Sequence, residues 1–223
     1  MGANTNFYTH ATLYQFGRKD ALSGTNTFYP EQETFPVAAT ASSYADAIKN
    51  PGTFFNGTNG QWVTTAYSNV WAGRFVHIYD VSSDYINTKV LKTVYDPCPP
   101  GYSMPTPRTF VDFGVIKTHK TDEIPQEEWD YDGGPRDDIV KGSWDNGWHF
   151  WADNTRTSTV YIPYISYRNG NSLGTNTYSR YHYALPQAPG TDYSMEFGTD
   201  RIIVFNNGIH WACACAVRPV KEE

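Results

Sequence analysis

Residues 201–217 read RIIVFNNGIHWACACAV, and this stretch decides the fold that we expect. Two apolar runs, 201–205 and 211–217, stand on either side of an Asn-Asn-Gly sequence of the kind that forms turns. Similar runs occur earlier, at 159–168 and 193–197, and they too are bounded by Gly, Asn and Asp. The last third of the chain therefore predicts an antiparallel sheet.

Helical signals are short and precede that sheet. Residues 42–52 combine a Ser cap, alanines and Ile48 in the body, and a terminating Asn-Pro pair. Residues 105–114 offer Thr106 as N-cap followed by Pro, and 12–20 has apolar residues at helical offsets. Two or three short helices before a twisted antiparallel sheet predict an α+β fold with long ordered loops.

Composition excludes several classes of function. The chain has 223 residues, a formal net charge of −6 and 16% aromatic residues, and it contains no basic run. A protein that binds phosphates needs a basic surface, so we expect no nucleic-acid partner. No stretch approaches the roughly 18 apolar residues of a membrane span, so we expect no direct membrane insertion. Residues 1–10 carry no pattern of an export signal.

The three cysteines leave at least one thiol without an intramolecular partner. Cys213 and Cys215 would share one face of a strand, about 6.5–7 Å apart, at the outer limit for a disulfide. Two thiolates with His210 nearby could bind a soft metal. The flanking alanines favour the alternative, in which each cysteine packs as a small apolar residue.

Two further segments allow more than one interpretation. Residues 122–138 hold eight carboxylates, which fits either a calcium loop or, as we prefer, a solvated acidic loop. The aromatic cluster Trp144, Trp148, Phe150 and Trp151 could stack on a sugar, but core packing is the interpretation that we favour.

Several motifs together resemble a known family. They are AIKNPGTFF (47–55), VYDPCPPGYSMPT (94–106), GWHFW (147–151), YIPYISYR (161–168) and AVRPVKE (216–222), in that order. They are similar to the C-type-lectin-like domains of Bacteroidetes-type surface proteins, in the fimbrillin-associated and major-paralogous-domain groups. The resemblance extends over 13–222. It implies one C-type-lectin-like α+β domain over residues 1–223, located at the cell surface, outside the cell or on a phage particle.

The chain departs from that family at two places. The family's closing motif carries a cysteine that pairs with the one equivalent to Cys98, but Pro219 stands there in this chain. We therefore expect no disulfide between Cys98 and Cys213 or Cys215. The Glu-Pro-Asn motif of calcium-dependent sugar-binding lectins is also missing. The resemblance thus implies no calcium-bridged sugar site, and we expect no cofactor or metal.

The region 161–215 has the composition of a binding surface. Seven of the seventeen tyrosines lie between residues 161 and 193, among Asn, Ser and Gly. Its mixture of residues resembles the variable region of proteins that are targets of diversity-generating retroelements. We predict that ligand contacts fall on residues near the chain's end: Tyr164, Tyr181, His182, Tyr183, Phe205, Asn206, Ile209, His210 and Trp211.

The function that follows is non-catalytic binding of a protein or glycan ligand at a surface, as an adhesin or receptor-binding module. An alternative is a copper-dependent oxidase related to formylglycine-generating enzymes, which would use Cys213 and Cys215. A third is a structural subunit that polymerises within a pilus or a larger surface assembly.

Overall fold

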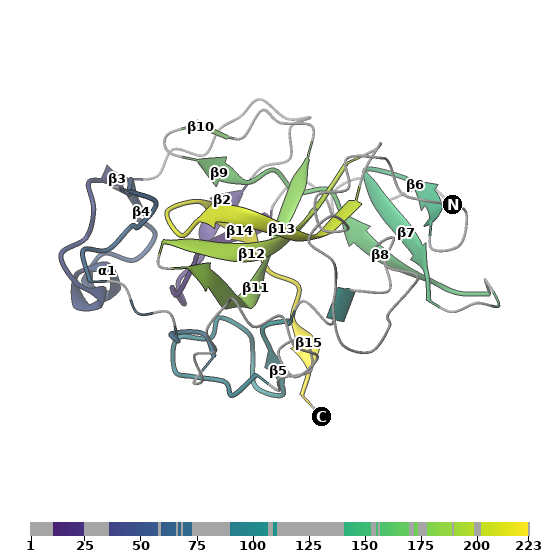
Figure 1. The fold of residues 1–223 in the computed structure, drawn as a ribbon, viewed down its shortest axis with the longest axis horizontal. Coiled ribbons are helices and arrows are strands. Elements are labelled where there is room, and N and C mark those ends of the chain that lie inside the picture. Colours follow the sequence, from purple (N-terminus) through teal and green to yellow (C-terminus); the bar gives the residue numbers. More distant parts are fainter. Residues whose placement is uncertain are drawn as a thin grey trace.

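The computed structural model describes residues 11–24, 36–72, 90–110, 141–169, 172–173, 178–198 and 202–222, apart from 58, 66, 68, 107, 108, 153, 154, 156 and 189. The described elements are strands with a single helix among them, α1 (Tyr44–Lys49). A large sheet occupies the centre of the molecule, and smaller sheets flank it (Figure 1).

In the described part of the chain, the central sheet has eight strands. Six follow the order β10-β9-β14-β11-β12-β13, and β1 pairs with both β14 and β2. Their bounds are β1 (Ala11–Gln15), β2 (Leu22–Gly24), β9 (Arg168–Asn169), β10 (Ser172–Leu173), β11 (Ser179–Ala188), β12 (Thr191–Phe197), β13 (Ile202–His210) and β14 (Ala214–Ala216). The pairs β11–β12 and β12–β13 are antiparallel, whereas β11 pairs with β14 in parallel.

Three smaller sheets surround this one. Strands β6 (Lys141–Trp144), β7 (Gly147–Trp151) and β8 (Thr159–Pro163) form an antiparallel sheet at the right of Figure 1. At the left, β3 (Val37–Ala38) and β4 (Phe54–Phe55) pair in parallel near α1. Strands β5 (Tyr102–Ser103) and β15 (Val220–Lys221) pair below the central sheet.

The expected α+β class with two or three helices is wrong. The protein is mostly β, and α1 is its one short helix among the described residues. That helix lies in the predicted segment 42–52, where Ser43 caps it by accepting from the N–H of Asp46. Within 105–114, residues 109 and 110 form a 3-10 turn, while 107, 108 and 111–114 lie outside the described residues.

Residues 12–20 begin as strand β1 instead of a helix. Leu13 and Gln15 are fully buried, whereas Thr12 is exposed and Tyr14 half-buried. This alternation has the period of a strand, because successive side chains point to opposite faces. Pairing with β14, in the register Leu13↔Ala216, outweighed the helical spacing of the apolar residues.

The strands predicted after Val160 are present, with different bounds. Residues 193–197 lie in β12, and the run 201–205 falls largely in β13. Of the run 159–168, residues 159–163 form β8 and Arg168 begins β9. The turn expected at Asn-Asn-Gly (206–208) was predicted wrongly, because β13 continues through these residues to His210 and the chain turns just before β14. Trp148 and Phe150 of β7 are buried in the largest core cluster of the described residues, and the half-buried Trp144 packs against it, in accordance with the core interpretation of these three residues. Trp151 is half-buried and lies outside that cluster.

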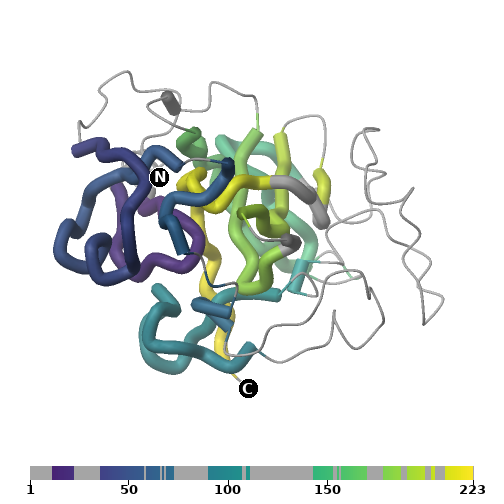
Figure 2. The backbone as a smooth tube through the Cα atoms, turned by 60° about the vertical axis from the view of Figure 1, so that its left-hand side comes forward, coloured from purple at the N-terminus to yellow at the C-terminus, as the bar shows by residue number. Residues whose placement is uncertain are grey.

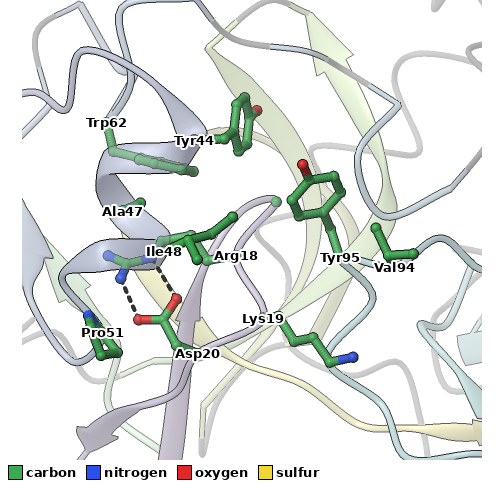
Figure 3. A pocket seen from close by; sticks show the side chains of 11 residues that line it. Arg18, Lys19, Asp20, Tyr44, Ala47, Ile48, Pro51, Trp62, Val94 and Tyr95 are labelled. Carbon is green, nitrogen blue, oxygen red and sulfur yellow. Dashed lines mark hydrogen bonds and ion pairs between the residues drawn. The ribbon is translucent and has the colours of Figure 1, made fainter.

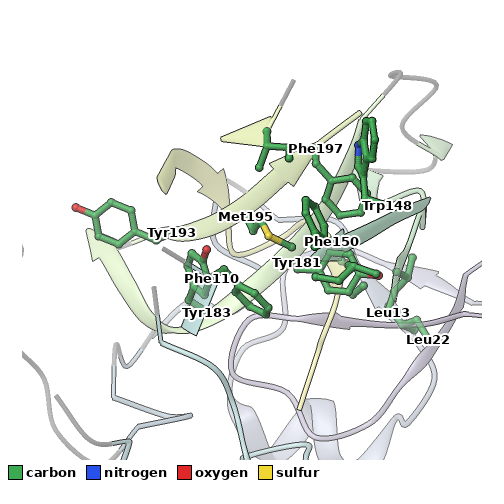
Figure 4. Packing of buried hydrophobic residues seen from close by; sticks show 14 of the residues in the cluster. Leu13, Leu22, Phe110, Trp148, Phe150, Tyr181, Tyr183, Tyr193, Met195 and Phe197 are labelled. Carbon is green, nitrogen blue, oxygen red and sulfur yellow. The ribbon is translucent and has the colours of Figure 1, made fainter. Parts of the chain in front are cut away.

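Strand β12 is buried on both faces. Tyr193, Met195 and Phe197 belong to the largest apolar cluster, shown in Figure 4. The alternate residues Asp192, Ser194 and Glu196 are also fully buried, on the other face. The two acidic residues among them pair with residues of β11: Glu196 with Arg180, and Asp192 with His182.

Two motifs far apart in the sequence meet where β5 pairs with β15. The backbone partners are Ser103 with Val220 and Tyr102 with Lys221. Lys92 lies beside them and donates to the carbonyls of Cys98 (2.7 Å) and Pro99 (2.9 Å). The segments DPCPPGY and VRPVKE therefore form one structural unit around the ammonium group of Lys92.

In the described part of the chain, no helix has the length and apolar character needed to cross a membrane.

Replacing Gly60 with Ala should destabilise the fold by about 2–3 kcal/mol. Gly60 has φ +80°, and an added Cβ would lie 2.9 Å from the carbonyl oxygen of Gly190. The left-handed backbone costs an L residue about 1–2 kcal/mol, and the backbone clash adds to that. Urea unfolding of the purified protein measures the loss.

Gly101→Ala is the matched control. Gly101 has nearly the same φ, +79°, but nothing lies within 4 Å of its added Cβ. The free energy of unfolding of this variant should therefore fall only by the backbone cost of about 1–2 kcal/mol, without the added cost of the clash. Equal losses in the two variants would show that the contact between the Gly60 and Gly190 segments is not tight.

Candidate functional site

The predicted ligand contacts near the chain's end are mostly buried. Of those whose side chains are described, only His210 is exposed. The following are 9% exposed or less: Tyr164, Tyr181, His182, Tyr183, Ile209 and Trp211. Phe205 and Asn206 lie in β13, but their side chains are outside the described part of the structure.

These residues are distributed over different parts of the core. Tyr181 and Tyr183 belong to the largest cluster, where Tyr181 stacks on Phe197 at 5.9 Å between ring centroids. Trp211 stacks on Phe16 at 4.9 Å in a second cluster. Ile209 packs in a third cluster with both C-terminal cysteines. These side chains are engaged in core packing, and a direct contact between them and a ligand stays a prediction.

The hypothesis of a diversified surface concerns the same region, 161–215. A randomised surface needs side chains that can change without loss of the fold, and a fully buried ring such as that of Tyr183 does not meet this condition. If siblings of this gene are diversified, we expect the changes at exposed positions such as His210. Comparing the 3′ ends of such genes tests the hypothesis.

A set of chemically reactive groups lies in the interior. His182 pairs through Nδ1 with Asp192, and its Nε2 donates to the carbonyl of Tyr14 (2.9 Å). Burial alone would lower the pKa of His182, but Asp192, with a smaller contribution from Cys215, raises it well above its usual value. Burial also raises the pKa of Asp192. The pair therefore retains one shared proton.

Cysteine, histidine and aspartate are the residue types of a nucleophilic triad, but this set is closed to substrate. Cys215, His182 and Asp192 are all fully buried, and none of them lines the pocket described below. Sequence spacing did not reveal the set, because its members come from three neighbouring strands, β14, β11 and β12.

The thiols are free and buried. Cys213 and Cys215 pack against Tyr167 and Ile209, whereas Cys98 lies in a different cluster. Burial, with a further contribution from Cys215, raises the pKa of Cys213 to about 12. A neutral thiol is a poor nucleophile and a poor metal ligand, which favours the packing interpretation for Cys213. The acidic segment 122–138, the other metal candidate, lies outside the described residues.

A pocket of about 450 Å³ lies beside α1 (Figure 3). Helix α1 contributes Tyr44, Ala47 and Ile48, and the segment after β1 contributes 17–20. Pro51, Trp62, Val94 and Tyr95 complete the lining. We name this the Tyr44–Tyr95 pocket. Its walls are mainly apolar and aromatic, which is the usual character of small-ligand sites.

The aromatic wall of the Tyr44–Tyr95 pocket is held in place by packing and hydrogen bonds. The ring of Tyr44 lies 5.1 Å from that of Trp62 and 5.7 Å from that of Tyr95. The indole N–H of Trp62 donates to the carbonyl of Phe16 (2.7 Å). The Tyr44 hydroxyl is bonded to the backbone of Tyr67, and burial raises its pKa to about 12, so it remains a neutral phenol.

The polar part of the pocket is an ion pair. Arg18 is 2% exposed at its side chain and donates through Nε to Asp20 (2.9 Å) and through Nη1 to Gln15 and Thr53. Its guanidinium lies 5.0 Å from the ring centroid of Phe55. Asp20 is 28% exposed and also accepts from the N–H of Gly52 (3.0 Å). Arg18 is thus enclosed, while the Asp20 carboxylate remains reachable.

This pocket was not predicted from the sequence, although one signal for it is present. Tyr44 and Ile48 are four residues apart in the predicted helix and therefore share a face. That face contributes to the pocket, and Ile48 is left 65% exposed. The partners from 17–20 and 94–95 could not be identified, because their approach to α1 depends on the tertiary fold.

Neither a family model, nor a curated protein, nor a solved structure matches this chain.

Proposed function

We propose that the chain is a non-catalytic ligand-binding module and that the Tyr44–Tyr95 pocket is its binding site. The observation that carries the proposal is the pocket itself: about 450 Å³ with aromatic walls and one accessible carboxylate. Pockets of roughly 300–1,000 Å³ with few polar groups are typical of small-ligand sites.

Two exposed apolar side chains at the rim support this assignment. Ile48 and Val94 line the pocket and are 65% and 79% exposed. Apolar side chains grouped at a concave site are costly to leave in water, and such groups commonly mark an interaction site. A ligand seated in the pocket would cover both.

The site is also preorganised for binding. Trp62, Arg18 and Tyr44 are each fixed by hydrogen bonds to the backbone of other segments. A ligand therefore does not have to order these side chains, and less affinity is lost to conformational entropy. We propose that the ligand belongs to a partner outside the cell, as for an adhesin or receptor-binding module.

Rim substitutions test the proposal. Ile48→Ser and Val94→Ser should each weaken binding of a ligand, obtained by screening glycans, peptides and small molecules, by about tenfold or more. Both side chains are exposed, so the free energy of unfolding should change by about 0.5 kcal/mol or less. Calorimetric titration measures the affinity, and urea unfolding measures the stability.

Leu91→Ser is the matched control, because Leu91 is also an exposed apolar residue but does not line the pocket. The Leu91→Ser variant should bind the ligand with the same affinity as the unmodified chain. A His210→Ala variant that lost binding while both rim variants kept it would place the site at the chain's end and refute the assignment to the pocket.

A further inference from the structure

We propose that the Tyr44–Tyr95 pocket binds a flat aromatic ring that carries a hydrogen-bond donor at its edge, such as an indole or a phenol, and that Asp20 accepts from this donor. The inference rests on the proposed function and adds the chemical class of the ligand.

The walls favour a ring. Tyr44, Trp62 and Tyr95 contribute three aromatic side chains, and the pairs that Tyr44 forms have centroid distances of 5.1 and 5.7 Å. Aromatic rings associate at about 4.5–7 Å in tilted or edge-to-face arrangements, so a further ring can extend this cluster. Ile48 and Val94 would then cover the outer edge of the ring.

The apolar lining disfavours a sugar. A sugar ring carries hydroxyl groups around its whole circumference, and each one that enters without a partner costs free energy. Among the lining residues, the groups with charge are limited to Arg18, Lys19 and Asp20. Arg18 is enclosed by its own partners, and so a ligand with a single polar edge fits this lining better.

The hydrogen bonds that Asp20 already accepts favour a ligand that donates one more. An ionised carboxylate has about four acceptor positions, and Asp20 uses three of them, two for Arg18 and one for the N–H of Gly52. The Asp20 side chain is 28% exposed, so a ligand can reach its remaining acceptor position. Because the charge of Arg18 offsets that of Asp20, a neutral N–H or O–H fits here better than a cation.

Arg18, the cation of the ion pair with Asp20, is not available to an anionic ligand. Arg18 is 2% exposed, and its Nε, Nη1 and Nη2 already donate to Asp20, Gln15 and Thr53. An incoming carboxylate or phosphate could not form the bidentate contact for which arginine is used. An anion placed at this ion pair would instead meet the carboxylate of Asp20, which leaves the exposed Lys19 as the lining cation that an anion could reach.

A titration of the ¹⁵N-labelled chain, followed by backbone and indole NMR signals, tests the chemistry. Indole and p-cresol carry the donor, 1-methylindole and 4-methylanisole lack it, and 4-methylcyclohexanol lacks the aromatic ring. We expect indole to bind about tenfold or more tightly than 1-methylindole, with p-cresol ahead of both 4-methylanisole and 4-methylcyclohexanol. The shifted signals should include the indole N–H of Trp62 and the amides of residues 17–20.

Variants and an extended probe complete the design. In Asp20→Asn, the ratio of the indole and 1-methylindole affinities should fall toward one, because the amide offers a weaker acceptor. N-acetyltryptophanamide distinguishes the sources of the ring. Tighter binding than indole indicates a side chain of a peptide partner, and weaker binding indicates a free small molecule.

The outcomes separate this inference from the function on which it rests. Equal binding of indole and 1-methylindole overturns the role of the donor, and equal binding of p-cresol and 4-methylcyclohexanol overturns the preference for a ring. If other small molecules shift the Trp62 and residue 17–20 signals while indole and p-cresol do not, the inferred ligand class is wrong and the binding function stands. If no compound of a broad fragment set shifts them, both proposals fail.

Discussion

Replacing His182 with Leu is expected to lower the free energy of unfolding by about 3–5 kcal/mol, because the change leaves the carboxylate of Asp192 buried without its cation. Both side chains are fully buried, and His182 also donates to the carbonyl of Tyr14. In the described structure, the second oxygen of Asp192 has no hydrogen-bond partner to compensate the loss. Urea unfolding followed by tryptophan fluorescence measures the effect.

The double variant His182→Leu/Asp192→Leu is the control. Replacing a buried ion pair with apolar residues of similar volume is often nearly neutral, so the double variant should recover much of the stability that the single variant loses. A double variant as unstable as His182→Leu alone would show that the loss comes from packing against Trp71 and Phe16, whose rings contact the imidazole, instead of from the charge.

The same pair makes stability depend on pH. In the unfolded chain, His182 loses its proton near pH 6.5, whereas in the folded chain Asp192 raises the pKa of His182 well above that value. The pair's contribution is therefore complete below about pH 6.5 and is lost as the pH rises through the raised pKa. We expect this component, up to about 1.4 kcal/mol per pH unit, to be absent from the double variant.

The second large effect is expected from Gln15→Leu, at about 4 kcal/mol. Gln15 is fully buried, and its amide donates to the carbonyls of Phe55 and Ala212, both at 2.8 Å. Its oxygen accepts from the N–H of Phe55 (3.1 Å) and from Arg18 (3.0 Å). Leucine would leave these groups without a partner, and each unsatisfied buried group costs about 1–3 kcal/mol.

Thr12→Leu is the comparison for that variant, because Thr12 lies in the same strand but is exposed. It should change the free energy of unfolding by about 0.5 kcal/mol or less. If thermal and urea unfolding showed Gln15→Leu to be as stable as Thr12→Leu, the bonds between β1, β4 and residue 212 would not contribute to the fold.

These residues also show how far the sequence could predict the structure. The alternating run 193–197 and the capped segment 42–52 depend on local signals, and both were predicted correctly. Residues 12–20 were predicted wrongly, because Gln15 is used for bonds with residues 55 and 212 that no local pattern indicates. The balance between strand and helix in that segment was decided by distant partners.

For the candidate site too, the sequence indicated local features but not those that depend on distant partners. Tyr and Trp near the chain's end have the composition of a binding surface, but composition does not say which side of a strand faces solvent. In β11, Tyr181 and Tyr183 face one cluster and His182 faces the other direction, so neither side was left exposed. The pocket beside α1 arises where 17–20 and 94–95 approach the helix, and that approach was not encoded locally.

The pairing of β1 with β14 has a consequence for synthesis of the protein. Leu13 pairs with Ala216, so the central sheet joins segments from the two ends of the described chain, side by side in Figure 2. At about 5–20 residues per second, a ribosome needs on the order of 10–40 s to proceed from one strand to the other. During that time β1 has no β14 with which to pair, and its backbone is open to other chains. The nascent protein should therefore depend on chaperones until β14 emerges.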